Sequence, residues 1–141
     1  MELAELTRTA FAAWNDRRFE EVLDFFHEDA VWDMTPFGLA GVGEYRGHEG
    51  LRRFFGDWLE AFPDSSVEVE EVEVRGPWTL SIVEQRVSGG SSKAQVPFRY
   101  GGIGRWRGDR LEFVENHLDL DRARAAFEEY VAGTRSLKSA S

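Results

Sequence analysis

Apolar residues in the first half of the chain recur at the spacing of helices. Residues 2–14 form an amphipathic segment that ends at Trp14, and a second short helix is expected after Asp16, which can cap it. The strongest helical pattern has apolar residues three and four positions apart: Leu51, Phe54, Phe55, Trp58, Leu59 and Phe62. Pro63 then ends this helix. Together with the two earlier segments, it makes three predicted helices in the first half.

The second half changes to the alternation that is typical of strands. Four strands joined by hairpin-length connections are predicted at 67–75, 78–88, about 94–107 and 110–118. In the first of them the alternation slips at Glu70-Glu71, which predicts a β-bulge that curves the sheet. The connections favour an antiparallel meander.

Three further segments complete the predicted architecture. A short strand is expected at 30–34, a loop at 35–45, and a last helix at about 121–131. Helices followed by a bent antiparallel sheet make an α+β fold. A curved sheet wrapped around helices encloses a cone, and such a cone is a natural ligand pocket.

Composition limits the kinds of partner and the chemistry that are open to this chain. The 141 residues fit one domain, predicted at 1–132, and the small and polar segment 133–141 is expected to be a disordered tail. A net charge of −9 disfavours nucleic acid and anionic membranes. Without cysteine, disulfides and thiolate chemistry are excluded. No signal peptide or membrane-spanning run is visible, so a cytoplasmic protein is expected.

Three stretches of sequence carry a resemblance to a known superfamily. They are WNDRRFEEVLDFFHEDAVWD (14–33), YRGHEGLRRFF (45–55) and ENHLDLDRARAAF (115–127). With the order of helices and strands, they make the chain resemble the nuclear transport factor 2-like superfamily, in particular its SnoaL-like polyketide cyclase and limonene epoxide hydrolase branches. The resemblance covers about residues 3–131. It implies a cone-shaped α+β fold, while the activities within this superfamily differ.

The epoxide hydrolase branch has two catalytic acids that the chain lacks. In that branch an Arg-x-Asp pair lies on a middle strand and a second Asp lies on the closing strand. By the resemblance the arginine is Arg86, but the two acids are replaced by Ser88 and Asn116. Neither replacement is a general base near neutral pH, so epoxide hydrolysis by that mechanism is disfavoured.

The ketosteroid isomerase branch places its base at the end of the strand before the long loop. An ungapped match puts Met34 on that position, and the neighbouring Asp33 then points to the opposite face of the strand unless the register shifts. Asp33 is therefore a candidate base only with such a shift.

Side-chain alternation decides which polar residues can reach a ligand. By the resemblance, the face of strand 78–88 that carries Glu84 and Arg86 lines the cone. The alternative is a structural ion pair between these two residues, or a solvated strand end. On the closing strand, Asn116 is expected in the cone and His117 on the convex face, where two subunits often pack in this superfamily. The opposite register keeps His117 as a candidate base.

No metal site and no cofactor are expected. His117, Asp119 and Asp121 would project from one side of a continued strand, but Asp121 is better explained as the N-cap of the last helix. The glycines of GGIGRWRG lie within a strand pattern and do not form a dinucleotide-binding loop.

Two functional hypotheses follow. The first is a cofactor-independent isomerase, cyclase or dehydratase that acts on a hydrophobic carbonyl compound. In this hypothesis Arg86 stabilises the oxyanion, and Glu84 or Asp33 is the base, with His117 as the reserve base. Asn116 and Ser88 are donors that orient the substrate. Residues expected to contact the substrate are mainly aromatic: Trp14, Trp32, Met34, Phe54, Trp58, Ser88 and Tyr100.

The second hypothesis is a non-catalytic protein of the same fold that binds a hydrophobic ligand or serves as a dimeric scaffold. A carboxylate or an imidazole in the cone would distinguish the enzyme from the binding protein. A homodimer through the convex face of the sheet is expected in either case, with Val83, Val87 and Ile103 as its apolar contacts.

Overall fold

A computed structural model describes residues 2–39, 42–87 and 96–137, and it has the α+β architecture predicted from the sequence. The helices are α1 (Leu3–Asn15), α2 (Phe19–Leu23), the 3-10 helix η1 (Thr35–Phe37), α3 (Gly47–Ala61) and α4 (Leu120–Ala132). The strands are β1 (Phe26–Asp33), β2 (Glu44–Arg46), β3 (Ser66–Arg75), β4 (Trp78–Val87), β5 (Val96–Arg107) and β6 (Arg110–His117).

All six strands form one sheet in the order β2-β1-β6-β5-β4-β3. The meander from β3 to β6 is antiparallel as predicted, but β1 pairs with β6 in parallel, so the sheet is mixed. The register of β3 on β4 shifts between Val69 and Glu71, which confirms the predicted bulge.

Two boundaries near β1 differ from the prediction. The strand begins at Phe26 and not at residue 30, so His27, Glu28 and Asp29 also lie in it. The predicted loop 35–45 contains the start of β2, which pairs with the end of β1. Both segments are too short and too polar to show a strand period, and their pairing with distant residues decides their structure.

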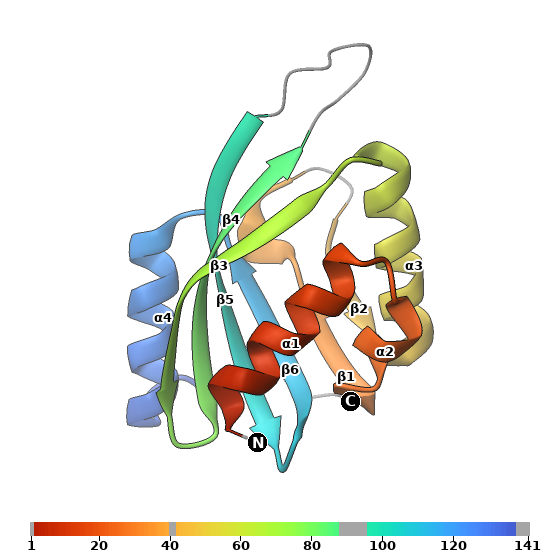
Figure 1. The fold of residues 1–141 in the computed structure, drawn as a ribbon. Coiled ribbons are helices and arrows are strands. Elements are labelled where there is room, and N and C mark those ends of the chain that lie inside the picture. The colour runs from red at the N-terminus through yellow and green to blue at the C-terminus, as the bar shows by residue number, and fades with distance from the viewer. Residues whose placement is uncertain (1, 40–41, 88–95, 138–141) are drawn as a thin grey trace.

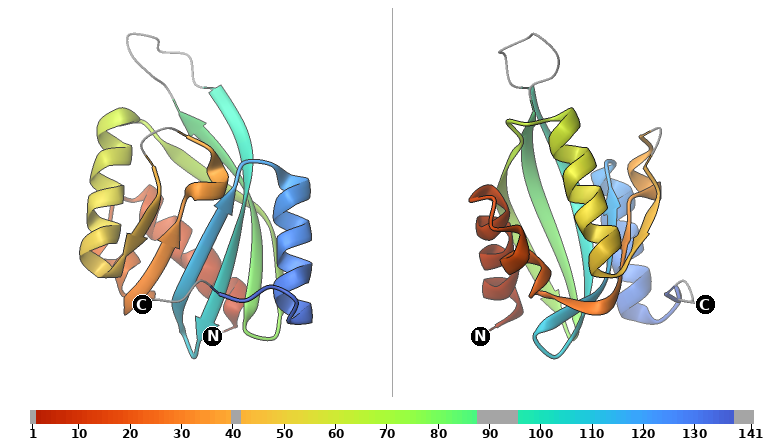
Figure 2. Two further views of the ribbon diagram at one scale, coloured as in Figure 1. Left: turned by 180° about the vertical axis from the view of Figure 1, so that it is seen from behind. Right: turned by 90° about the vertical axis from the view of Figure 1, so that its right-hand side faces the viewer.

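Helices cover both faces of the sheet (Figures 1 and 2). Helices α1, α2 and α3 lie over the concave face and bury the larger apolar core, while α4 lies across the convex face. Gly101 permits this second packing, because a Cβ at that position would lie 2.5 Å from the Cβ of Ala123. The N-cap of α4 is Asp119, which accepts from the backbone N–H of Arg122, and not the predicted Asp121.

The side chain of Asn15 fixes α1 over the concave face of the sheet. Its Nδ2 donates to the carbonyl of Val67 at 2.7 Å, and its Oδ1 accepts from the N–H of Val67 at 2.9 Å. The amide thus pairs with the edge strand β3 as another strand would. This pairing holds the end of α1 against β3.

Two of the three residues expected to make apolar dimer contacts are buried within the chain. Ile103 is fully buried beneath α4, and Val83 is fully buried in the core on the concave side. Within the described part of the predicted tail, Leu137 also packs against the residues under α4. Dimerisation therefore stays a prediction, and neither Val83 nor Ile103 is exposed to take part in it.

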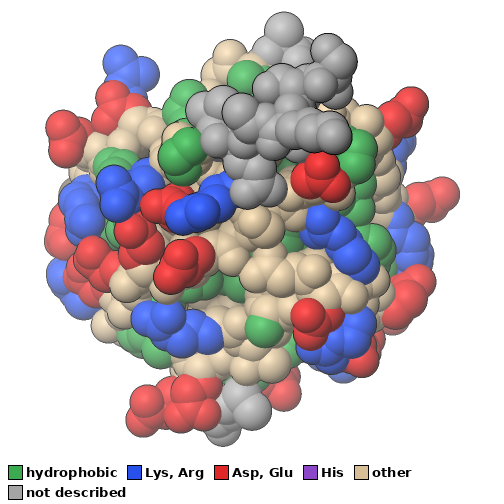
Figure 3. Space-filling view, turned by 45° about the horizontal axis from the view of Figure 1, so that its top comes forward, with side chains coloured by type: hydrophobic (Ala, Val, Ile, Leu, Met, Phe, Trp, Pro, Cys, Tyr) green, Lys and Arg blue, Asp and Glu red, His purple; other side chains and the backbone are tan. Residues whose placement is uncertain are grey.

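The outer surface is charged and mixed in sign. Acidic and basic side chains are intermixed across the face in Figure 3. Surface ion pairs of the chain include Arg75–Glu128 and Arg99–Glu70. Among the described residues, no helix is both long and apolar enough to cross a membrane.

Candidate ligand-binding site

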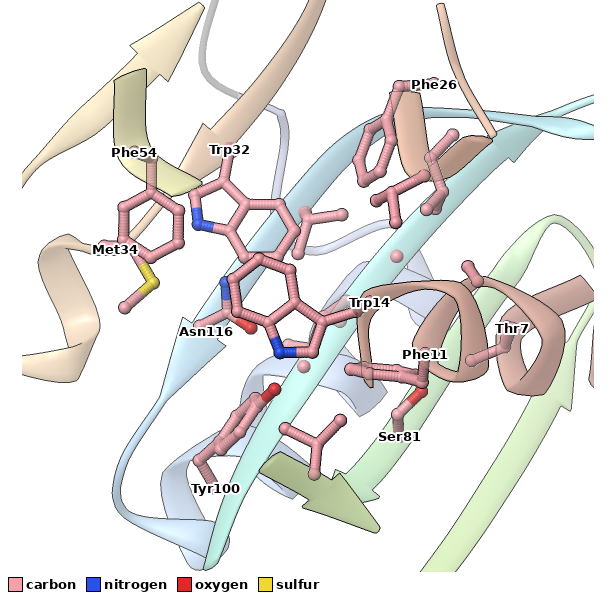
Figure 4. Close-up of a pocket in the computed structure, with 18 of the residues that line it drawn as sticks. Thr7, Phe11, Trp14, Phe26, Trp32, Met34, Phe54, Ser81, Tyr100 and Asn116 are labelled. Carbon is pink, nitrogen blue, oxygen red and sulfur yellow. The ribbon is translucent and has the colours of Figure 1, made fainter. Parts of the chain in front are cut away.

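The concave face and its helices enclose a cavity of about 110 Å³. Helix α1 contributes residues at one helical face, and α3 contributes the aromatic residues of its strongest apolar stripe. Residues of the concave side of β1, β4, β5 and β6 form the floor. Figure 4 shows side chains from all these elements converging on the space. This inner space holds several water molecules, and because the pocket is partly open to solvent, a ligand of more than one ring can extend beyond it.

Aromatic rings form most of the wall. The rings of Trp14 and Phe55 are 5.1 Å apart between centroids, and those of Trp32 and Phe54 are 5.5 Å apart. The ring of Tyr100 lies 5.7 Å from that of Phe37. These spacings are typical of edge-to-face and tilted aromatic contacts, which make a rigid apolar wall.

Several polar side chains of the wall are paired with one another. Trp58 Nε1 and Gln85 Nε2 both donate to the hydroxyl of the buried Ser65, at 3.1 and 2.8 Å. Trp106 Nε1 donates to Thr79 Oγ1 at 3.0 Å. These bonds satisfy the polar atoms within the protein, so they leave the groups little capacity to recognise a ligand.

Two other polar groups of the wall lack such bonds, and a third polar group lies near them. Asn116 Nδ2 and Trp32 Nε1 are buried and have no hydrogen-bond partner among the described residues. The hydroxyl of Tyr100, which also lines the cavity, is directed toward the side where Asn116 lies (Figure 4). Burial raises the pKa of Tyr100 above its ordinary value, so this phenol stays protonated and can donate.

Two glycines of β5 make room for these polar groups. Gly102 pairs with Asn116 across β5 and β6, and a Cβ on Gly102 would lie 3.1 Å from Asn116 Oδ1. A Cβ on Gly104 would lie 2.8 Å from both Thr79 Oγ1 and Leu111 Cδ2. The glycines of this strand therefore serve close side-chain packing at the floor of the pocket.

Glu84 and Arg86 do not lie in the cavity, which corrects the expectation for their strand. The pocket side of β4 carries Thr79, Ser81 and Gln85, whereas Glu84 and Arg86 point to the convex side. They form an ion pair of 2.9 Å, and the Arg86 side chain is 53% exposed. Because both faces of β4 are buried along most of its length, apolar alternation alone cannot tell the pocket face from the face under α4.

Asp33 is buried outside the pocket as a structural group. Its Oδ1 accepts from the backbone N–H and the hydroxyl of Thr35, at 2.9 and 2.6 Å, and so stabilises the start of η1. Its neighbours along the chain, Trp32 and Met34, line the cavity. Side chains alternate along the strand, so the side chain of Asp33 points away from the pocket. The register shift that Asp33 would need in order to act as a base is not present.

His117 is also outside the pocket, in a buried cluster under α4. Its Nε2 lies 2.6 Å from Glu115 Oε2, and Tyr130 donates to Glu115 Oε1 at 2.8 Å. Burial raises the pKa of Glu115, but hydrogen bonds from His117 and Tyr130 and the charge of Arg135 outweigh burial and hold the pKa below its ordinary value. His117 faces the chain's own last helix.

Seven of the predicted site residues line the cavity: Trp14, Trp32, Met34, Phe54, Trp58, Tyr100 and Asn116. Ser88 lies outside the described residues. The polar residues of β4 that line it, Thr79, Ser81 and Gln85, were not predicted. In the sequence, polar residues on this face of the strand alternate with the bulky apolar residues Trp78, Leu80 and Ile82 on the other face. This difference between the two faces is the pattern that indicates them.

The family of the chain follows from its sequence. Residues 7–114 match the SnoaL-like domain family, and the chain belongs to this family. No curated protein gives a significant match.

Solved structures of the same fold cover nearly the whole chain. An NTF2-like protein of unknown function from Burkholderia pseudomallei is 19% identical, with 90% of this chain and 98% of that chain covered and a TM-score of 0.74. TerC, crystallised with polyporic acid, is 20% identical, with 92% and 97% covered and a TM-score of 0.71. SalBIII, an epoxide hydrolase/cyclase-like enzyme of pyran ring formation in the polyether salinomycin, is 13% identical, with 81% and 88% covered and a TM-score of 0.68. At these identities the likeness shows the fold alone.

Proposed function

We propose that this protein binds a neutral and largely apolar small molecule in the cone. The observation that carries the proposal is the chemistry of the wall. Its 24 described lining residues include no carboxylate, imidazole, ammonium or guanidinium group. A charged ligand would have to enter this wall without a counterion, which costs several kcal/mol. A neutral ring system would bury its apolar surface against the aromatic side chains and gain free energy.

A few polar groups are enough to orient such a ligand. Pockets for small molecules are usually apolar, with a small number of hydrogen-bonding groups that set orientation. Here Trp32, Asn116 and Tyr100 can serve as those groups, whereas Trp58, Gln85 and Trp106 already donate within the wall. That TerC, which has this fold, was crystallised with polyporic acid also supports a role with small organic molecules.

Thermal unfolding with matched probes tests this proposal. Naphthalene and naphthoate have the same ring system, but naphthoate adds a carboxylate. At about ten times its dissociation constant, a ligand contributes about 1.4 kcal/mol to stability, which corresponds to roughly 4 °C in Tm. We expect this rise with naphthalene and none with naphthoate. Equal effects of the two probes, or no effect of either, would contradict the proposal.

Substitutions outside the cavity supply the matched control. Glu84→Gln and Arg86→Ala remove an exposed ion pair that does not line the pocket. We expect both variants to bind naphthalene as the wild type does, with stability changed by about 0.5 kcal/mol or less. A large loss of binding in either variant would place the ligand on the other face of β4.

A second candidate function is catalysis that polarises a carbonyl group without a protein base. One observation favours it: the protonated Tyr100 hydroxyl and the Asn116 amide converge on one side of the cavity. Such donors stabilise an enolate-like oxygen, and SalBIII shows that an enzyme can have this fold. This candidate retains the isomerase or cyclase hypothesis but assigns the work to neutral groups.

Deuterium exchange separates binding from catalysis. In D₂O, polarisation of the carbonyl of α-tetralone would let a solvent or buffer base remove a proton from the adjacent carbon, and the enolate would then take up deuterium from D₂O. NMR follows this exchange directly. Exchange above the buffer rate that is lost in Tyr100→Phe would support catalysis. If α-tetralone binds but its hydrogens exchange at the buffer rate, only the binding function is supported.

A further inference from the structure

Two buried donors in the wall, Asn116 Nδ2 and Trp32 Nε1, have nothing to donate to among the described residues. Asn116 is only 2% exposed, so bulk solvent cannot serve as its partner. Buried polar groups in folded proteins are almost always hydrogen-bonded, and those that are not call for an explanation. Here both lie at one cavity, which points to a bound molecule as the missing partner.

The sheet register brings these two donors together. Trp32 on β1 pairs with Val114 on the neighbouring strand β6, and Asn116 is two residues further along β6. Both side chains therefore lie on the pocket face as diagonal neighbours. In Figure 4 the indole of Trp32 and the amide of Asn116 lie on the same side of the cavity.

The orientation of the Asn116 amide leaves no acceptor between them. Its Oδ1 lies on the β5 side, 3.1 Å from the position of a Cβ on Gly102. Its Nδ2 is therefore on the side of β1, which carries Trp32. Two N–H groups from adjacent strands thus lie at the same end of the cavity, and an oxygen atom there would accept from both.

Trp32 fixes the polarity of the group that can bind here. An asparagine amide can donate or accept according to its rotation, and a tyrosine hydroxyl can do both. An indole N–H can only donate. A ligand that fits this end of the pocket must therefore present an acceptor, and the uncharged wall excludes a carboxylate or phosphate as its source.

We propose that the ligand of this pocket is a neutral cyclic carbonyl compound, a ketone or a quinone, whose oxygen accepts hydrogen bonds from Trp32 Nε1 and Asn116 Nδ2. This inference rests on the proposed ligand-binding function and specifies its substrate class. Trp32 becomes the residue that determines specificity, because it distinguishes a carbonyl compound from a hydrocarbon or a pure donor of the same shape. Tyr100 is placed to donate to a second oxygen.

The test uses α-tetralone and tetralin, two bicyclic molecules of almost the same shape, of which only the first has a carbonyl group. Dissociation constants are measured for the wild type and for Trp32→Phe, which keeps an aromatic ring but removes the N–H. Trp106→Phe is the matched control, because the N–H of Trp106 already donates to Thr79. The indole ¹⁵N–¹H signals of the wild type are recorded with each probe, and Trp32→Phe identifies the Trp32 signal.

We expect Trp32→Phe and Asn116→Leu to weaken α-tetralone binding by roughly tenfold each, as for one lost hydrogen bond. Tetralin binding should change by less than about twofold in both variants, and Trp106→Phe should not discriminate between the probes. In the wild type the Trp32 N–H signal should shift downfield with α-tetralone and stay in place with tetralin.

The outcomes separate this inference from the function on which it rests. If both probes bind the wild type equally and the Trp32 signal responds to neither, the carbonyl inference is overturned while ligand binding stands. If neither probe binds, both proposals fail. Should Trp32→Phe weaken both probes alike, Trp32 acts through shape alone, which also refutes its role as a donor.

Discussion

The substitution Ser81→Val tests the location of the ligand site by filling it. Ser81 is on the pocket face of β4, is 4% exposed, and its side chain points into the cavity in Figure 4. Valine adds apolar volume there and suits a strand. If the space is empty in the free protein, the larger side chain can occupy it without moving its neighbours.

The expected magnitude follows from the apolar groups added. Valine places two methyl groups where serine has one hydroxyl, which at about 0.8 kcal/mol for each buried carbon gives an upper limit of about 1.6 kcal/mol. Allowing for imperfect fit, we expect a gain of about 1 kcal/mol and a rise in Tm of roughly 3–4 °C. Because the added methyl groups occupy ligand space, affinity for naphthalene should fall by at least about tenfold, the equivalent of 1.4 kcal/mol.

Thermal unfolding and ligand titration measure the two effects on the same sample. Ser66→Val is the control, since Ser66 is a strand residue that does not line the cavity. Its stability should change by less than about 0.5 kcal/mol and its ligand affinity should stay the same. If Ser81→Val destabilises the protein by about 1–3 kcal/mol, as overpacking does, the cavity is not available space. If it stabilises the protein and leaves affinity unchanged, the ligand binds elsewhere.

Two further predictions concern the packing of α4. Glu115→Gln should lower stability near neutral pH by about 2 kcal/mol, because it removes the charge from buried hydrogen bonds with His117 and Tyr130. The pKa of Glu115 is lower in the folded than in the unfolded protein, so its ionised form stabilises the fold above the unfolded-state pKa. The difference in unfolding free energy between the wild type and the variant, measured by denaturation, should therefore shrink as pH falls below about 4. Gly101→Ala should destabilise by about 1–3 kcal/mol through the Cβ of Ala123, and adding Ala123→Gly should recover part of that loss in a double-mutant cycle. Additive effects in this cycle would show that the two residues do not press on one another.

The elements with strong local periods were predictable from the sequence. The third helix and the four meander strands follow from apolar spacing, and the bulge near Glu70 follows from a single slip in alternation. The parallel pairing of β1 with β6 was not predictable in this way. It joins segments about 80 residues apart, and no local pattern records such a contact.

The pocket could be predicted only in part, for a physical reason that is clearest in β4. Leu80 and Ile82 face α4, while Thr79 and Ser81 face the cavity, so both sides of the strand are buried. From the sequence, a polar residue in such a strand can either contact a ligand or form an ion pair at the exposed end of the strand. Glu84 and Arg86 form such an ion pair. The unpaired donors of Trp32 and Asn116 depend on neighbours from three strands, which only the structure supplies.

If no group of the protein that changes its charge between about pH 5 and about pH 9 touches the ligand, the affinity for a neutral ligand does not depend on pH in that range. Among the described lining residues only Tyr100 can titrate, and burial raises its pKa. The dissociation constant of α-tetralone, which is itself neutral, should therefore be constant from about pH 5 to about pH 9 while the protein stays folded. A change in affinity of tenfold or more within this range, with a midpoint typical of a carboxylate or a histidine, would contradict the account.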